Sequence, residues 1–392
     1  MNENIKSNIW KLYTITALER FMLFIPTIVL FFQENGLNMR EILLLQSVFS
    51  LGMILFEIPS GYFSDVLGRK YTLVFGSILG FFGICIYAFS YGFYGFMLAE
   101  LVLGLGASFI SGTDSALLYD TLEQIGKTDD YKKIEGKMSS VGNFSEAIAS
   151  VLGGFLALIS LRTPLYIEIF IMFLTIPISL SLIEPSRHKY KNEEGVFKEI
   201  LKIVKYSVHH HKEVKWLIFY SGFVGASTLT MVWFIQPYFS LVGLPLAYFG
   251  FMWGLLNLSV GLFSLYAHKI EKYLGRKKSL ISLIFLSFLG YILVAIFQSL
   301  WSIIFIFIFY FVRGFGGPVI MDYINKIISS NMRATVLSIK NLFARVVYSI
   351  IGPFIGWIAD IYSFSQAFVI SGTIFLTLGA LSLLFLHKYK AL

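Results

Sequence analysis

The feature that most constrains this chain is a series of roughly a dozen apolar runs, separated by short polar breaks. A helix that crosses the hydrocarbon of a bilayer needs about 20 mostly apolar residues, and these runs meet that length. They do not alternate apolar with polar residues, which excludes a β-barrel. Only 14% of the residues are charged, against about 25% in soluble domains. The sequence therefore predicts an all-α membrane protein.

We expect twelve transmembrane helices, at residues 9–32, 41–60, 71–90, 93–119, 138–159, 164–183, 215–239, 246–267, 279–297, 300–324, 336–358 and 365–387. If the N-terminus is inside, most of the 31 Lys and Arg are cytoplasmic, and the outer loops hold only Arg40 and Arg162. By the positive-inside rule, this split predicts an N-in/C-in topology. The net charge of +8 then indicates orientation and contact with anionic lipid rather than binding of nucleic acid.

A repeat divides the chain in two. The tetrapeptide Leu-Gly-Arg-Lys occurs at 67–70 and at 274–277, an offset of 207 residues, and the same offset relates Gly36 to Gly243. We expect two six-helix bundles, residues 1–183 and 214–392, joined by a cytoplasmic linker at 184–213 with an amphipathic helix over 196–208. Three adjacent histidines, 209–211, point in different directions on a helix, so we expect a solvated linker and no metal site. With one cysteine, Cys85, no internal disulfide is possible.

Residues 61–70 read G-Y-F-S-D-V-L-G-R-K. This segment resembles the signature of the major facilitator superfamily between helices two and three, G-x-x-x-D-x-x-G-R-K. The resemblance implies two pseudo-symmetric bundles and a cytoplasmic latch between the halves. It places Asp65 opposite the start of span eleven and pairs Arg69 with Asp120. The latch residues that it implies are Gly61, Asp65, Gly68, Arg69, Lys70 and Asp120, with Glu57 as either a latch partner or a proton site.

The chain is also similar to the twelve-helix drug–proton antiporters of that family, but only in part. Their glycine-rich pattern in span five is represented by Gly153 and Gly154, and Glu100 occupies the place where they favour an arginine. The second copy of the signature is degenerate, with Lys272 in place of the aspartate. These departures put a direct transfer of the antiporter mechanism in doubt.

Charged residues inside the spans are functional candidates, because a charge at the bilayer centre costs about 2.5–3.5 kcal/mol on insertion scales. The carboxylates lie in the first half and the cations Arg313, Lys340 and Arg345 in the second. Helical spacing predicts Glu100 and Asp114 on one face of span four. A carboxylate in a partly dry cavity can exchange protons near neutrality. The proton-coupling and cavity candidates are Glu19, Arg20, Asp114, Glu100, Glu146, Arg313 and Arg345, with Glu19 and Asp114 leading; static pairing that only fixes helix positions is the rival account.

We predict a secondary active transporter, exporting a small amphipathic or drug-like compound in exchange for protons. The alternatives are proton-coupled uptake of a sugar or other metabolite, and translocation of a lipid. Clustered Asp or His at a membrane face, which an enzyme on activated lipids would need, is not evident, so we expect no enzyme and no cofactor. We expect a monomer in a bacterial inner membrane. The candidate substrate contacts are Phe24, Trp233, Gln236, Tyr238 and Asn257.

Overall fold

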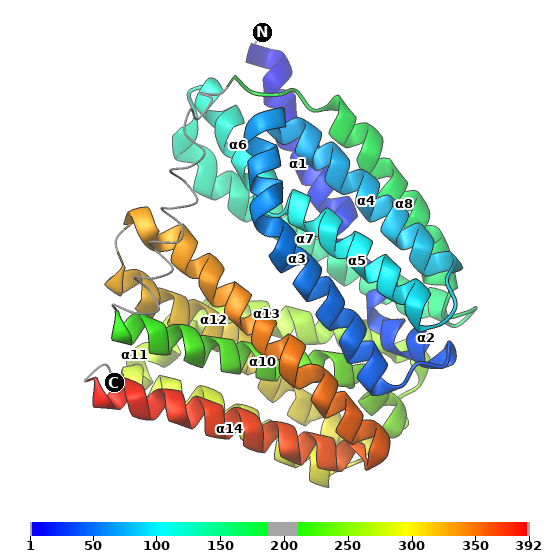
Figure 1. Cartoon of the computed structure of the whole chain (residues 1–392), viewed down its shortest axis with the longest axis vertical. Coiled ribbons are helices and arrows are strands. Elements are labelled where there is room, and N and C mark those ends of the chain that lie inside the picture. The colour runs from blue at the N-terminus through cyan, green and yellow to red at the C-terminus, as the bar shows by residue number, and fades with distance from the viewer. Residues whose placement is uncertain (1, 187–210, 329, 390–392) are drawn as a thin grey trace. The chain divides into compact units, whose positions relative to one another are not determined.

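The structure, a computed structural model, describes residues 2–186, 211–328 and 330–389, and its regular secondary structure in these ranges is helical throughout (Figure 1). Nine of the described helical segments are long and apolar enough to cross a membrane. The predicted all-α membrane class is confirmed, while the count of twelve spans and their orientation stay predictions. The expected linker helix at 196–208, together with His209 and His210, lies outside the described residues.

The chain divides into two compact units. Unit 1 comprises residues 1–37, 48–191 and 246–254. In it α4 packs along α5 and α8, and α1 packs along α7 and α8 (Figure 1). Leucines, one isoleucine and one methionine from α1, α4, α6 and α7 form a buried cluster that Leu182 completes. The helices of unit 1 are α1 (Asn2–Glu19), α2 (Ile28–Glu34), most of α3 (Met39–Leu67), α4 (Arg69–Phe89), α5 (Phe93–Ile110), α6 (Thr113–Gln124), α7 (Tyr131–Ala157) and α8 (Thr163–Ser181).

Unit 2 comprises residues 38–47, 192–245 and 255–392. Its central helix, α10, packs against α12, α13 and α14. A loop was expected near 268–278, but helical structure continues through this stretch as α11, interrupted only at Gly275, whose φ is 73°. The helices of unit 2 are α10 (Lys212–Leu241), most of α11 (Phe249–Ile296), α12 (Ile306–Ile327), α13 (Ser330–Ile361) and α14 (Phe364–Lys388), with the 3-10 helix η5 (Leu300–Phe305) before α12.

Each unit incorporates the start of one helix that mostly belongs to the other. The first residues of α3 belong to unit 2, where the Asp360 carboxylate accepts the backbone N–H groups of Met39 and Arg40 at 2.8 Å each. The first residues of α11 belong to unit 1, where Gly250 lies against Gly154. Segments 38–47 and 246–254 are related by the 207-residue offset of the repeat to within one residue. The predicted division at 183 and 214 does not include this exchange.

Candidate functional site

The first predicted span, 9–32, is broken near its middle. Helix α1 ends at Glu19, residues 20–24 are not helical, and the chain resumes as the 3-10 helix η1 (Ile25–Thr27) and then α2. The expectation of one continuous helix is therefore wrong. Pro26 supplies a local reason, because it has no N–H to donate and it disfavours helical geometry at the residue before it.

The fourth predicted span, 93–119, is also two helices. α5 ends at Ile110, and α6 begins after Gly112, which adopts φ 78° in the left-handed region. Glycine is the residue that reaches this conformation without steric cost. Since the break resets the helical phase, the expected common face of Glu100 and Asp114 does not exist. Asp114 instead lies in the first turn of α6, where the helix dipole favours a negative charge.

The two breaks bring four predicted residues together with one that the sequence analysis missed. Glu19 interacts electrostatically with Asp114 and Arg20, and Asp114 interacts with Glu135. A guanidinium nitrogen of Arg20 lies 3.7 Å from a carboxylate oxygen of Glu146. We call this group the acidic cluster: Glu19, Asp114, Glu135 and Glu146, around Arg20.

Small side chains give the acidic cluster its packing. At Gly142 on α7, a Cβ atom would lie 3.1 Å from Cγ of Arg20 and 3.2 Å from a methyl carbon of Thr16. The Ser145 hydroxyl donates a 2.6 Å hydrogen bond to the Ala17 carbonyl. α7 therefore fits closely against the end of α1, which sets the position of Arg20.

Glu135 was missed because span five was expected to begin at residue 138, whereas α7 begins at Tyr131. The Ser115 hydroxyl donates to Glu135 at 2.7 Å, and the other Glu135 carboxylate oxygen is buried with no hydrogen-bond partner. The available signal was spacing: Glu135 and Glu146 are three helical turns apart and lie on one face.

The chemistry of the acidic cluster follows from its charge balance. Glu19 and Asp114 interact with one another and with the same arginine, Arg20, so two like charges and one opposite charge act on each other there. Side chains of this kind can take up protons or a cationic group. Broken helices at membrane depth are also the positions where transporters place ion and substrate sites.

Glu100 does not belong to the acidic cluster. It is buried on α5 and accepts a hydrogen bond from the hydroxyl of Tyr87. The ring of Tyr87 packs 6.3 Å from that of Phe24, and Phe24 is itself buried. In this structure Glu100 and Phe24 are therefore parts of an aromatic core in unit 1.

The predicted residues of unit 2 have varied surroundings. Arg313 is exposed on α12, with its guanidinium 5.6 Å from the centre of the Tyr310 ring. Gln236 and Tyr238 are buried on α10, and the Tyr238 hydroxyl donates to the Phe297 carbonyl at 2.7 Å. Tyr238 is therefore packed within unit 2, and its role as a substrate contact stays a prediction. The remaining candidates, Trp233, Asn257 and Arg345, are half-buried.

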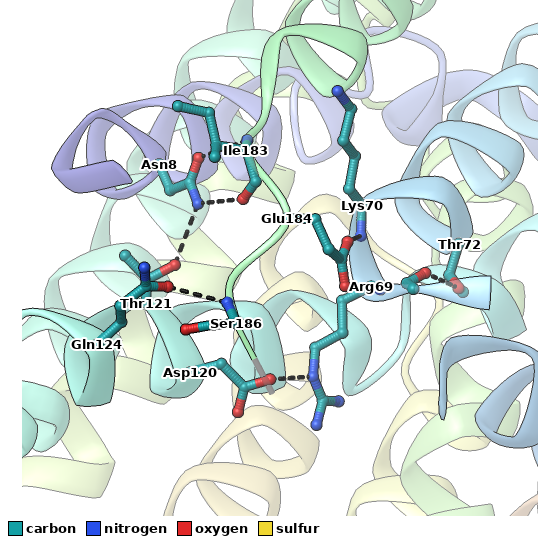
Figure 2. A network of polar contacts seen from close by, with 11 residues as sticks. Asn8, Arg69, Lys70, Thr72, Asp120, Thr121, Gln124, Ile183, Glu184 and Ser186 are labelled. Carbon is teal, nitrogen blue, oxygen red and sulfur yellow. Dashed lines mark hydrogen bonds and ion pairs between the residues drawn. The ribbon is translucent and has the colours of Figure 1, made fainter. Parts of the chain in front are cut away.

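Three of the predicted latch residues, Arg69, Lys70 and Asp120, lie close to the start of α4 (Figure 2). Arg69 forms an ion pair with Asp120 on α6. The Glu184 carboxylate accepts the backbone N–H groups of Arg69 at 3.0 Å and of Lys70 at 2.8 Å, which caps the start of α4. Gly68, just before α4, has φ 124°. The sequence analysis did not single out Glu184, because nothing local marks it as a cap for a helix 115 residues away.

Further hydrogen bonds anchor the segment after α8 in the same network (Figure 2). The Asn8 side-chain amide donates to the Ile183 carbonyl at 2.8 Å and to the Thr121 hydroxyl at 3.1 Å. The Ser186 N–H donates to Gln124 at 3.0 Å. The predicted latch residues Glu57, Gly61 and Asp65 are exposed on the last turns of α3, and their role stays a prediction.

Comparison with known proteins now places the chain. The sequence pattern of the Major Facilitator Superfamily matches residues 10–353. The chain belongs to this family. Membership of this family makes it a multi-pass membrane protein, in agreement with the long apolar helices of both units.

Curated relatives of this facilitator match about half of its length and about half of their own. An uncharacterized transporter of Buchnera aphidicola subsp. Schizaphis graminum is 29% identical over 226 residues, 55% of this chain and 53% of the relative. The quinolone resistance protein NorA of Staphylococcus aureus is 24% identical over 208 residues, 53% of each.

Solved structures share the fold over nearly the whole chain. A mutant of the nucleoside transporter NupG superposes with a TM-score of 0.82 at 15% identity, covering 96% of this chain and 99% of NupG. The POT family transporter PepTSo superposes with a TM-score of 0.74 at 14% identity, covering 98% of each chain. At these identities the likeness establishes the fold alone.

Proposed function

We propose that this facilitator exports a small amphipathic or drug-like compound by alternating access, in exchange for protons. The observation that carries the proposal is the acidic cluster, in which Glu19, Arg20 and Asp114 at the two helix breaks meet Glu135 and Glu146 of α7. The partial similarity to the quinolone resistance protein NorA supports export of a drug-like compound.

The acidic cluster supplies a direct route to exchange. A proton and a cationic substrate would compete for the same negative charge, so binding of one would favour release of the other. Glu19 and Asp114 are the groups that we expect to carry the proton, because they interact with one another and lie at the two breaks. Arg20, held by Glu146, would limit how much negative charge the cluster presents.

The same proposal includes a topology and a latch. We propose twelve spans with both ends in the cytoplasm, in a bacterial inner membrane, as a monomer. The distribution of Lys and Arg supports this orientation. In it, the Arg69–Asp120 ion pair lies on the cytoplasmic side, where Asp65 would help hold the outward-open state.

The test uses purified full-length protein in liposomes that contain a pH-sensitive dye, with an imposed pH gradient. Ethidium is the lipophilic-cation probe, and we expect proton flux opposite to ethidium flux in the wild type. The test variant is Glu19→Gln, in the acidic cluster. Its matched control is Glu34→Gln, which removes an exposed carboxylate at the end of α2. Proton flux in the same direction as a sugar or a nucleoside, with no response to ethidium, would replace export by uptake.

A further inference from the structure

Glu168 on α8 is a buried carboxyl group outside the acidic cluster. The residue has no solvent exposure (0%). One carboxylate oxygen accepts the Leu23 backbone N–H at 2.9 Å, and the other is buried without a hydrogen-bond partner. An ionised carboxylate needs several donors or a cation when it is removed from water, and here it has one amide.

Among the described residues, no cation compensates a charge on Glu168. Glu168 is buried, and its hydrogen-bond donor is the Leu23 amide. No charged side chain among the described residues interacts electrostatically with it. α1, α4 and α7 pack against α8. These three helices carry five titratable groups in the part of unit 1 near the break at residues 20–24. They are Glu19 and Arg20 at the end of α1, Cys85 and Tyr87 on α4, and Glu146 on α7. Of these, Arg20 is already paired with Glu146.

Leu23 attaches the broken part of span one, residues 20–24, to α7 and α8. Its N–H is held by Glu168, and its carbonyl lies so close to Gly153 on α7 that any side chain there would collide with it. Helix α1 ends only a few residues before Leu23. Because Glu19 and Arg20 of the acidic cluster adjoin this segment, their placement depends on how Leu23 is held.

We propose that Glu168 is a second proton-binding site of this chain, and that its proton keeps the break in span one docked. In the neutral acid, one oxygen accepts from Leu23 and the other carries the proton. Loss of that proton to water leaves a carboxylate with two oxygens to satisfy. The carboxylate would then recruit water or the backbone N–H groups of residues 20–24, and the segment would rearrange together with Arg20.

This inference goes beyond the proposed export function and needs no transport substrate for its test. The first measurement is infrared spectroscopy of the full chain in lipid nanodiscs at pH 7, recording the carbonyl stretch of protonated carboxyl groups. We expect the wild type to show a component of this band that Glu168→Gln lacks and that Glu34→Gln retains. Identical bands in the wild type and Glu168→Gln would overturn the assignment.

The second measurement separates a proton site from a static helix cap. Hydrogen–deuterium exchange of peptides covering residues 20–27 is compared between the wild type and Glu168→Gln at matched pH values, so that intrinsic exchange chemistry cancels. We expect the wild-type segment to become less protected than the Gln variant by about tenfold as the pH rises, because Gln cannot lose a proton. An equal response to pH in the two proteins would reduce Glu168 to a fixed cap and refute the switch.

If Glu168→Gln fails to fold, Glu168→Asp can be used to test whether Glu168 is the proton-binding group. The shorter side chain keeps a titratable carboxyl group but moves it away from Leu23. We expect a protonated-carboxyl band at a changed frequency, and protection of residues 20–27 that no longer depends on pH. An unchanged frequency would place the band elsewhere in the protein and contradict the proposal. Failure of either measurement leaves ethidium–proton exchange by the acidic cluster untouched, so the two proposals are tested separately.

Discussion

Spans one and four of unit 1 are broken, whereas their counterparts in unit 2 under the repeat, α10 and α12, run through without interruption. The difference is not one of glycine content. α12 contains Gly314, Gly316, Gly317 and Pro318 and stays helical, while span four breaks at the single Gly112. A glycine-rich stretch therefore does not by itself mark a break.

What distinguishes these glycines is what surrounds them. A Cβ atom at Gly314 would lie 2.6 Å from the Val260 carbonyl oxygen, and one at Gly316 would lie 2.9 Å from the Leu283 side chain. A Cβ at Gly112 would meet nothing within 4 Å, but its φ is left-handed. Gly314 and Gly316 of α12 allow helices to approach closely, and Gly112 allows the chain to turn. The comparison teaches that unit 1 gathers carboxyl groups where spans one and four break, while α10 and α12 of unit 2 stay continuous.

The largest effect should come from Glu19→Gln, which tests whether the broken spans carry the coupling. We expect accumulation driven by the pH gradient to fall by roughly tenfold or more, since the link between proton and substrate is removed. Folding should be intact, because Gln has the same shape. Ethidium transport in liposomes measures this, with Glu34→Gln as the matched control. Wild-type accumulation in Glu19→Gln would remove this residue from the mechanism.

Gly153→Ala should give the next largest effect, on stability. The added methyl group collides with the Leu23 carbonyl, and overpacking of this kind costs about 3 kcal/mol in the free energy of unfolding. Gly136→Ala on the same helix is the control, because a Cβ there meets nothing within 4 Å. That change should stabilise α7 by up to about 1 kcal/mol. Unfolding in mixed micelles measures both; equal stability would show that Leu23 is not held in place by Gly153.

Asp65→Asn tests the signature of unit 1 against its degenerate copy in unit 2. We expect turnover to fall by roughly threefold to tenfold, because the loss of one charge loosens the latch. The matched change Lys272→Gln, at the corresponding position of the second copy, should have less effect. Initial rates of ethidium transport decide this, and equal rates for Asp65→Asn and the wild type would contradict a latch role.

Replacing arginine by lysine in each unit should give the smallest effects. Arg20 has a half-exposed side chain and a 3.7 Å contact with Glu146, so Arg20→Lys should change stability by no more than about 0.5 kcal/mol. Arg276 donates to Glu213 at 2.6 Å and lies over the Tyr323 ring at 4.9 Å. Losing that geometry in Arg276→Lys should cost about 1 kcal/mol. A larger loss from Arg20→Lys would show that the acidic cluster stabilises the fold as well as serving transport.

Much of the fold could be predicted from the chain alone. Apolar runs of bilayer length predicted an all-α membrane protein, and the 67–70 and 274–277 repeat predicted related halves. The signature at 61–70 indicated the family to which the chain belongs. The membrane class and the family are confirmed, because length, apolarity and a short turn motif are properties of local sequence; the division into two related six-helix halves stays a prediction.

The candidate site could be predicted only in part. Glu19, Arg20, Asp114 and Glu146 stood out because charges are costly inside a membrane. Glu135 and Glu184 did not, since the first lay in an expected loop and the second caps a helix that is distant in sequence. Nothing local in the sequence of span six indicated that Glu168 would be fully buried.

The sequence by itself determined which segments are apolar enough for a bilayer and which residues are too polar for lipid, because both follow from the cost of exposing backbone and charge to hydrocarbon. Only the tertiary structure decided where two of those helices break and which carboxyl groups then meet. The break in span one is fixed by Gly153 and Glu168, which lie 130 and 145 residues away from Leu23. A hydrogen bond or a close approach across such a separation has no local signature, so packing settles it.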